Sequence, residues 1–312
     1  MNEISYSAIC CYFGQWPNYF QLWLNSCGYN SGIDFWLVTD IPMEGLSVPQ
    51  NVKVLSMSFE DLRSRIVEVF KGEEICFERP YKICDFRPAY PEIFPEIVNQ
   101  YDYWGYFDID TLWGDILKFL PENSDKRYNK LLPCGHLSFL KNCPLVNTLY
   151  RQSEKMEGIR SWREVFSHPD AFYFDEDGGL EPLAKAVLKD TYWGGIPFDN
   201  VLPPWKFDHF YSINYPEKSR FLVYSYESGK LFRHYLKGYR LHKEEICYLH
   251  FSRRQVHLVV NQKSGNYCFY PNRIVPPIEW NLMKLLLHGR KRYIRHFIAG
   301  IVQKCGLNRK NN

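Results

Sequence analysis

Short apolar runs recur along the first part of the chain, and two of them stop at a glycine or an acidic residue. Residues 4–13 are almost uninterruptedly apolar up to Gly14, residues 33–40 end at Asp40, and residues 52–57 form a third run. Runs of this length and composition are typical of strands that are buried on both faces. We therefore predict three strands, the first of them in the centre of a parallel sheet.

Helices are predicted between these runs. Pro17 opens the segment 18–27, and Ser58 with Asp61 resembles a capping box that begins a helix through about Phe70. Strands that alternate with helices favour a parallel α/β sheet with right-handed connections. Ligands bind such sheets at the carboxyl ends of the strands, so the functional site is expected at that edge.

The stretch 104–115 holds the main candidate for chemistry. Aromatic residues of a further buried strand lead into Asp108 and Asp110, which an extended backbone places on one side. Mg²⁺ and Mn²⁺ are typically held by one or two carboxylates together with substrate phosphates. Most Asp-x-Asp pairs are solvated turn residues, but a buried strand rarely ends in two acids without a use for them. The pair therefore favours a metal-diphosphate site.

Residues at three predicted strand ends are candidates for contacts with a nucleotide. Phe13 and Gly14 follow the first run, Asp40 follows the second, and Asp108 follows the aromatic strand. In a parallel sheet these positions meet at one edge. We include all four among the expected binding residues.

Lys82 and Asp85 are two further candidates. They are three residues apart and would share one face of a helix, whose length Pro88 and Pro91 limit. One interpretation is an ion pair on the surface. The other is a cation and an acid at a pocket rim, in contact with a diphosphate and a sugar hydroxyl.

Three motifs, in order within residues 4–255, give the chain a family resemblance. They are Pro-Tyr-Lys-x-Cys-Asp-Phe-Arg-Pro at 80–88, Trp-Gly-Tyr-x-Asp-x-Asp at 104–110 and His-Phe-x-x-Arg at 250–254. With them the chain resembles nucleotide-sugar glycosyltransferases of the GT-A type, and more narrowly a bacterial family of uncharacterised glycosyltransferase-like proteins with a DxD motif.

The resemblance implies a GT-A fold over residues 1–275: a Rossmann-like α/β domain with a mixed, mainly parallel sheet flanked by helices. It also implies that Asp110 binds a metal directly, that Asp108 lies against the metal or the ribose, and that a late histidine, here His250, can be a third ligand. The implied cofactor is Mn²⁺ or Mg²⁺, and the implied donor is a nucleoside diphosphate sugar, with UDP as the expected nucleotide.

The segment around His250 adds candidates of its own. His250 ends an apolar segment and could complete a carboxylate, carboxylate and imidazole set suited to Mn²⁺, although a lone histidine is more often a hydrogen-bonded structural residue. Arg253 and Arg254 could bind a diphosphate, because the guanidinium fork fits phosphate oxygens. Their alternative is solvated surface charge.

An acidic loop supplies candidates for a catalytic base. Asp175, Glu176 and Asp177 precede two glycines. One of them could deprotonate an acceptor hydroxyl, helped by like-charge crowding that raises a pKa. The alternative is a solvated acidic turn before a helix N-terminus, which favours negative charge. The sequence does not choose among the three.

The end of the chain differs in composition from the rest. Residues 276–312 carry eight Lys and Arg residues against Glu279, and apolar positions from Ile294 to Val302 follow helical spacing. We predict a basic amphipathic helical tail. It could lie in an anionic membrane interface or pack its apolar face on the main domain.

Length and composition narrow the class of protein. The 312 residues include 46% hydrophobic and 17% aromatic residues, which suits a packed globular core. The ten cysteines show no CxxC, and the sequence has neither a secretory leader pattern nor a membrane-spanning run. We expect a reduced, cytoplasmic protein, on the inner face of the plasma membrane if the tail binds there. The tail carries a net charge of +7 and the rest of the chain −4, and no nucleic-acid-binding motif appears, so we expect no nucleic-acid partner.

Two functions remain at this point. The first is a metal-dependent hexosyltransferase that acts on a carbohydrate or lipid-linked saccharide acceptor in bacterial surface polysaccharide or lipopolysaccharide synthesis. The second is a non-catalytic carbohydrate- or nucleotide-binding protein on the same scaffold.

Overall fold

The protein is a mixed α/β structure made of two compact units that interleave along the sequence. The computed structural model describes residues 4–121, 127–192, 198–200, 222–237, 240–251, 256–270 and 273–288. The first unit comprises Met1–Trp16, Asn30–Ile109 and Leu117–Gly194, and the second comprises Pro17–Tyr29, Asp110–Ile116 and Gly195–Asn312. Each unit is considered on its own below.

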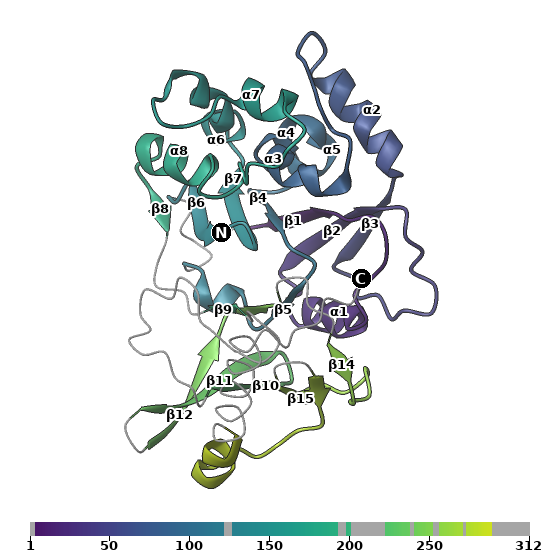
Figure 1. The fold of residues 1–312 in the computed structure, drawn as a ribbon, viewed down its shortest axis with the longest axis vertical. Coiled ribbons are helices and arrows are strands. Elements are labelled where there is room, and N and C mark those ends of the chain that lie inside the picture. The colour runs from purple at the N-terminus through teal and green to yellow at the C-terminus, as the bar shows by residue number, and fades with distance from the viewer. Residues whose placement is uncertain are drawn as a thin grey trace, which may run out of the picture. The chain divides into compact units, whose positions relative to one another are not determined.

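The first unit is built on a mixed sheet in the order β3-β2-β1-β4-β7-β6-β8 (Figure 1). The strands β3, β2, β1 and β4 are parallel, β7 is antiparallel to β4 and β6, and β8 is parallel to β6. Their bounds are β1 Tyr6–Cys11, β2 Ile33–Thr39, β3 Val52–Ser56, β4 Tyr103–Phe107, β6 Lys130–Cys134, β7 Leu137–Lys141 and β8 Thr191–Tyr192.

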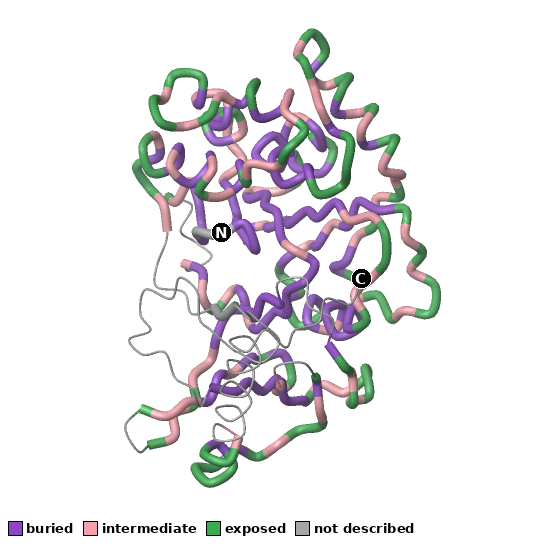
Figure 2. Tube along the Cα trace, in the orientation of Figure 1, coloured by how far each residue is buried: buried purple, intermediate pink, exposed green. Residues whose placement is uncertain are grey.

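The central strands of this sheet are covered on both faces. Every residue of β1 and β4 is buried, as Figure 2 shows along both strands. Such burial explains why these segments are continuously apolar rather than alternating. The strands predicted over residues 4–13, 33–40 and 52–57 and in front of Asp108 are therefore confirmed. Because β2, β1 and β4 are parallel neighbours, their carboxyl ends share one edge of the sheet.

Short helical segments pack on one face of this sheet (Figure 1). Strand residues such as Ile9, Trp104 and Tyr106 share a core with them. Prolines at the first turns divide the region after residue 79 into short pieces. The bounds are α2 Phe59–Val69, η1 Pro80–Lys82, α3 Ile83–Phe86, η2 Arg87–Ala89, α4 Tyr90–Ile93, α5 Pro95–Val98, α6 Pro144–Asn147, η4 Leu149–Lys155, α7 Trp162–Ser167 and α8 Leu180–Val187. A further short helix of this unit, η3 Leu117–Phe119, has no buried residue and is not part of that core.

The capping box predicted at the start of α2 is present. The Ser58 hydroxyl accepts a hydrogen bond from the Asp61 amide at 3.1 Å, and the Asp61 carboxylate accepts one from the Ser58 amide at 3.3 Å. These bonds satisfy amides that the helix leaves without partners. Leu62 and Ile66 then face the core.

The second unit contains helix α1 (Phe20–Gly28) and two sheets, in the orders β12-β11-β10-β15-β16-β14 and β5-β13-β9. A hairpin joins β10 and β11. Helical residues 282–288 follow Trp280, which packs with Leu285 against Val223. The strand bounds are β5 Thr111–Trp113, β9 Phe198–Asn200, β10 Val223–Glu227, β11 Lys230–Lys237, β12 Arg240–Ile246, β13 Tyr248–His250, β14 His257–Leu258, β15 Asn266–Tyr270 and β16 Arg273–Val275.

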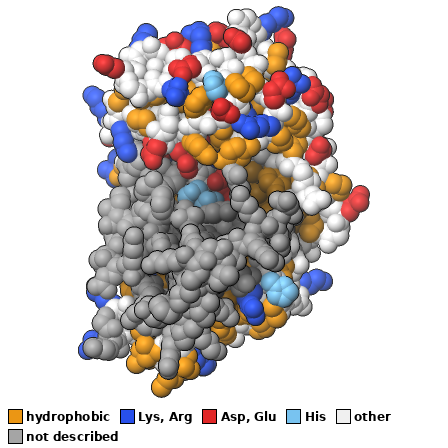
Figure 3. Space-filling model, in the orientation of Figure 1, with side chains coloured by type: hydrophobic (Ala, Val, Ile, Leu, Met, Phe, Trp, Pro, Cys, Tyr) orange, Lys and Arg blue, Asp and Glu red, His pale blue; other side chains and the backbone are white. Residues whose placement is uncertain are grey.

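Charged side chains of both signs lie on the face of the molecule that Figure 3 draws. On the face drawn in Figure 3, Lys and Arg side chains lie among Asp and Glu side chains. Within the described ranges, none of the helices combines the length and the hydropathy needed to cross a bilayer.

Candidate functional site

The candidate site residues of the first unit lie at the carboxyl edge of its parallel strands. Phe13 and Gly14 follow β1, Asp40 follows β2 and Asp108 follows β4, so the topology brings the four positions to the edge where the sequence predicts them. Gly14 has φ +113°, a backbone conformation that side chains disfavour, and it is exposed. Asp40 is also exposed, while Phe13 is half-buried and packs on Phe59.

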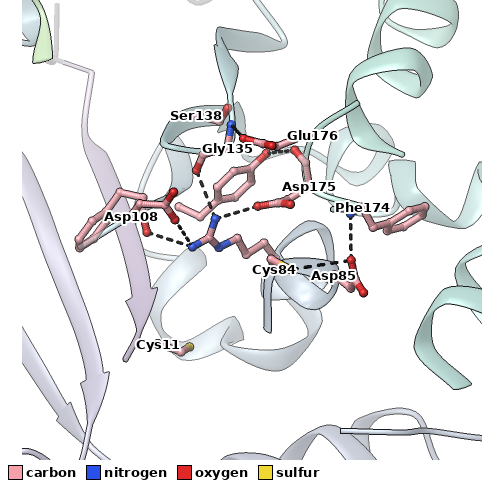
Figure 4. Close-up of polar contacts among 12 residues, drawn as sticks. Cys11, Cys84, Asp85, Asp108, Gly135, Ser138, Phe174, Asp175 and Glu176 are labelled. Atoms are coloured by element: carbon pink, nitrogen blue, oxygen red, sulfur yellow. Dashed lines mark hydrogen bonds and ion pairs between the residues drawn. The ribbon is translucent and has the colours of Figure 1, made fainter. Parts of the chain in front are cut away.

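Arg87 links Asp108 to the acidic loop. One guanidinium nitrogen, Nη2, donates to Asp108 Oδ1 at 2.6 Å and to the Phe107 carbonyl at 3.3 Å. The other, Nη1, donates to Asp175 Oδ2 at 2.7 Å and to the Gly135 carbonyl at 3.3 Å (Figure 4). The Arg87 side chain is only 9% exposed, so these charged hydrogen bonds lie away from bulk water.

The structure separates the three acids of the loop. Asp175 is buried against Arg87, Asp177 is exposed, and Glu176 is half-buried with Oε1 accepting from the Gly135 amide at 2.9 Å. A Cβ on Gly135 would lie 2.4 Å from that oxygen, so only glycine allows this approach.

Burial controls the charge state of these carboxyl groups. It raises the pKa of Asp175 to about 8, against the opposing effect of Arg87 and with a further increase from Glu176. Burial also raises the pKa of Glu176, and the nearby charge of Asp108 adds to the increase. Like charges that are crowded in a low-dielectric region raise the pKa of carboxyl groups.

Lys82 and Asp85 require a correction, because the pair lies neither on the surface nor at a pocket rim. The two side chains are 1% and 0% exposed, and Lys82 Nζ lies 2.7 Å from Asp85 Oδ2. The same nitrogen donates to the carbonyls of Val165 at 2.7 Å and Asp170 at 2.6 Å, which engages all three of its N–H groups. Lys82 and Asp85 of the motif at 80–88 are therefore part of the protein interior.

Asp85 completes this arrangement by holding the loop that carries the acids. Its carboxylate accepts hydrogen bonds from the amides of Phe172 at 3.0 Å and Phe174 at 2.9 Å. Phe174 directly precedes Asp175. The buried ion pair thus fixes the backbone from which the loop acids project.

His136 is a candidate metal ligand that sequence reasoning missed. Its carbonyl accepts from the Asp108 amide at 3.1 Å, so the turn between β6 and β7 lies beside the end of β4. A ring nitrogen of His136 and a carboxylate oxygen of Asp108 lie within 4.8 Å of each other, close enough for both to reach one ion. His136 directly precedes the apolar residues of β7, but the antiparallel pairing of β7 with β4 could not be seen in the sequence.

In the second unit, Asp110 and His250 lie together as the sequence predicts. His250 Nε2 is 3.2 Å from Asp110 Oδ1, and both residues are 9% exposed. The pairing of β13 with β5 places His250 opposite Thr111, and the Phe251 amide donates to the Asp110 carbonyl at 2.6 Å. Strand pairing thus positions this carboxylate and this imidazole.

Two predicted features fall outside the described residues. These are Arg253 with Arg254, and the basic segment after residue 288. Their proposed contacts with a diphosphate and with a membrane stay predictions, as does the domain boundary at 275/276.

Carboxylate and imidazole groups are suitable donors for Mn²⁺. Asp108 and Asp110 supply hard oxygen ligands, and His136 and His250 supply nitrogen ligands that this ion also accepts. Asp108 with His136 in the first unit, and Asp110 with His250 in the second, are therefore donors of a kind that suits a divalent ion.

Comparison with known proteins gives a family but no curated relative. Residues 8–277 match a family described as "Family of unknown function (DUF6625)". No curated protein sequence matches. Two crystal structures of the glycosyltransferase GlyE from Streptococcus pneumoniae TIGR4, one of them the apo form, are similar at 11% and 15% sequence identity with a TM-score of 0.28. The likeness covers 62% of this chain and 45% of theirs, so the chain spans less than half the length of those structures.

Proposed function

The chain belongs to the DUF6625 family, whose function is unknown, and we propose that it is a metal-dependent glycosyltransferase of the GT-A type. The proposed reaction moves a hexose from a nucleoside diphosphate, UDP by resemblance, to a carbohydrate or lipid-linked saccharide hydroxyl. The observation that carries the proposal is that a carboxylate and an imidazole lie together in each unit, Asp108 with His136 and Asp110 with His250, and that the two aspartates are only two positions apart in the chain. The three sequence motifs support the same assignment.

The proposed metal ligands are Asp108, Asp110 and His250, with His136 as an additional candidate. Asp108 and Asp110 are two positions apart, so the chain itself keeps their Cα atoms within about 7 Å. His250 lies beside Asp110, and His136 lies beside Asp108. A bound divalent ion would neutralise the negative charge that develops on the departing diphosphate.

Glu176 is the proposed base among the three loop acids. Asp175 is engaged by Arg87 and Asp177 is exposed, whereas Glu176 is half-buried and its pKa is raised by burial and by Asp108. A carboxylate with a raised pKa is a stronger proton acceptor near neutral pH. Its role is to take the proton of the acceptor hydroxyl.

The nucleotide is proposed to lie along the carboxyl edge of the first sheet, near Phe13, Gly14 and Asp40. Open α/β sheets bind ligands at this edge, and the positive φ of Gly14 favours glycine there, which leaves the backbone without a side chain. By resemblance, the pathway is the synthesis of a bacterial surface polysaccharide or lipopolysaccharide.

The decisive experiment compares the wild type with Asp110→Ala in a panel of nucleotide sugars. We expect Mn²⁺-dependent release of nucleoside diphosphate from one donor, its loss on chelation with EDTA, and a rate at least about 100-fold lower in the variant, as when a group that stabilises developing charge is removed. Asp190→Ala is the matched control, because Asp190 is an exposed acid beside β8, at the far end of the sheet order.

Calorimetry with Mn²⁺ and free nucleoside diphosphates separates the alternatives. Binding of both without turnover of any donor or acceptor would favour the non-catalytic binding protein. Turnover that is unchanged in Asp110→Ala would overturn the proposed metal site.

A further inference from the structure

Arg87 holds together three segments of the first unit that are distant in sequence. Its guanidinium bonds to the end of β4 at Phe107 and Asp108, to the β6–β7 turn at Gly135, and to the acidic loop at Asp175. The bonds to the two carboxylates are 2.6 and 2.7 Å long, as expected for charge-assisted pairs. Figure 4 shows Asp108, Gly135 and Asp175 converging on this point.

The backbone that carries Arg87 is itself fixed. Arg87 begins the short helix η2, directly after the helix α3 that contains Asp85. Lys82 bonds to the backbone at the start of the segment 165–174, and Asp85 bonds to the backbone at its end. The helical segment 80–89 is therefore attached to the acidic loop by the ion pair and to the end of β4 by Arg87.

We propose that Arg87 is a positioning residue: it orients the Asp108 carboxylate toward the cation and, through Asp175, sets the position of the loop that carries Glu176. The inference rests on the proposed function, because it assigns a role relative to the metal and the base. Arg87 touches neither substrate nor metal in this scheme. It acts through the two carboxylates that it holds.

The chemistry of arginine suits this role in a way that lysine does not. Guanidinium has five N–H groups in one plane, so it can bond to carboxylates on two edges at once. An ammonium group carries the same charge at one point and cannot reach both acids from the same backbone position. Arg87→Lys therefore keeps the charge near Asp108 and removes the two-sided bonding.

The test measures Mn²⁺ affinity of the full chain by calorimetry and thermal stability of the same samples. Partners that orient metal ligands typically change metal affinity by about 10–100-fold when they are removed. We expect Arg87→Lys to weaken Mn²⁺ binding at least about tenfold. The matched control is Arg233→Lys, because Arg233 is also a buried arginine and bonds to a carboxylate in the second unit. We expect it to lower the thermal stability with its Mn²⁺ affinity unchanged.

A second pair of variants keeps the test decisive if Arg87→Lys does not fold. Asp175→Asn retains an oxygen that can accept from Arg87 Nη1, whereas Asp175→Leu has a similar volume and no acceptor. We expect Mn²⁺ affinity close to wild type in the first and about tenfold weaker in the second.

Three outcomes are distinct. Equal Mn²⁺ affinity in the wild type and Arg87→Lys, or in the two Asp175 variants, overturns the positioning role. A wild type that binds no Mn²⁺ overturns both this role and the proposed metal site. If the wild type turns over no donor but the variants bind Mn²⁺ more weakly than it does, the positioning role is supported and only the proposed reaction is overturned.

Discussion

Each unit contains a buried cation that bonds to a carboxylate, but the two carboxylates differ in their access to water. In the first unit Lys82 bonds to Asp85, whose side chain is 0% exposed. In the second unit Arg233 bonds to Glu244, whose side chain is 40% exposed. A fully buried pair cannot be broken without leaving an uncompensated charge, whereas a half-exposed carboxylate can return to water.

The two pairs also connect different kinds of structure. Arg233 and Glu244 lie directly opposite each other on the adjacent strands β11 and β12, which backbone bonds already hold together. Lys82 and Asp85 bond to the backbone of the segment 165–174, which belongs to no sheet. The Lys82–Asp85 pair therefore helps to determine where the acidic loop lies, and the Arg233–Glu244 pair reinforces a ladder.

The largest effect is expected from Lys82→Met. The substitution leaves Asp85 buried without its cation, and breaking such a pair costs about 3–5 kcal/mol of the free energy of unfolding. Hydrogen exchange should also accelerate at the amides of Phe172 and Phe174, which Asp85 holds. Urea denaturation and exchange of the same samples measure the two effects.

A double variant checks the cause of that loss. Lys82→Met with Asp85→Asn removes the uncompensated charge and retains an oxygen acceptor for the loop amides. It should recover part of the stability. A double variant no more stable than Lys82→Met would contradict the comparison, because the charge would then not be the source of the loss.

A smaller loss of stability is expected when the pH is lowered, because of His234 in the second unit. Burial lowers the pKa of His234 to about 4, with Lys243 lowering it further and Glu227 opposing both. Its pKa in the unfolded chain is about 6.5, so the unfolded state takes up the proton first as the pH falls. The stability that the neutral ring confers is complete above about pH 6.5 and is lost progressively toward pH 4, by at most about 3 kcal/mol.

His234→Gln tests this pH dependence. The glutamine cannot take up a proton, so the free energy of unfolding between pH 7 and pH 4.5 should fall less than in the wild type. Denaturation curves at three pH values give the difference. An equal fall in the free energy of unfolding in both proteins would show that His234 does not cause the acid sensitivity.

The sequence predicts local features of the molecule better than contacts between distant segments. The strands before Gly14, Asp40 and Asp108 and the cap at Ser58 depend on neighbouring residues, and all are confirmed. The pairing of His250 with Asp110 spans 140 positions and was predicted from their shared position at strand ends together with a family resemblance.

Features that depend on long-range packing were not predictable. A lysine and an aspartate three residues apart are compatible with a solvated helix face, and only the segment 165–174 folding over them makes Lys82 and Asp85 interior. His136 and Gly135 likewise gain their importance from the pairing of β7 with β4. The role of Arg87 could not be seen, because its partners lie 21 and 88 positions away.

The smallest of the three effects, and the one that sharpens the comparison most, is expected from Arg233→Met. Glu244 is 40% exposed and can be hydrated once the guanidinium is gone, while the methionine retains much of the buried apolar volume. We expect a loss of about 1–2 kcal/mol, between the values for exposed and for fully buried ion pairs. Glu244→Gln, which keeps the hydrogen-bond acceptor, should lose less. If Arg233→Met instead costs as much as Lys82→Met in the same urea titration, then the exposure of the carboxylate does not decide the strength of these pairs.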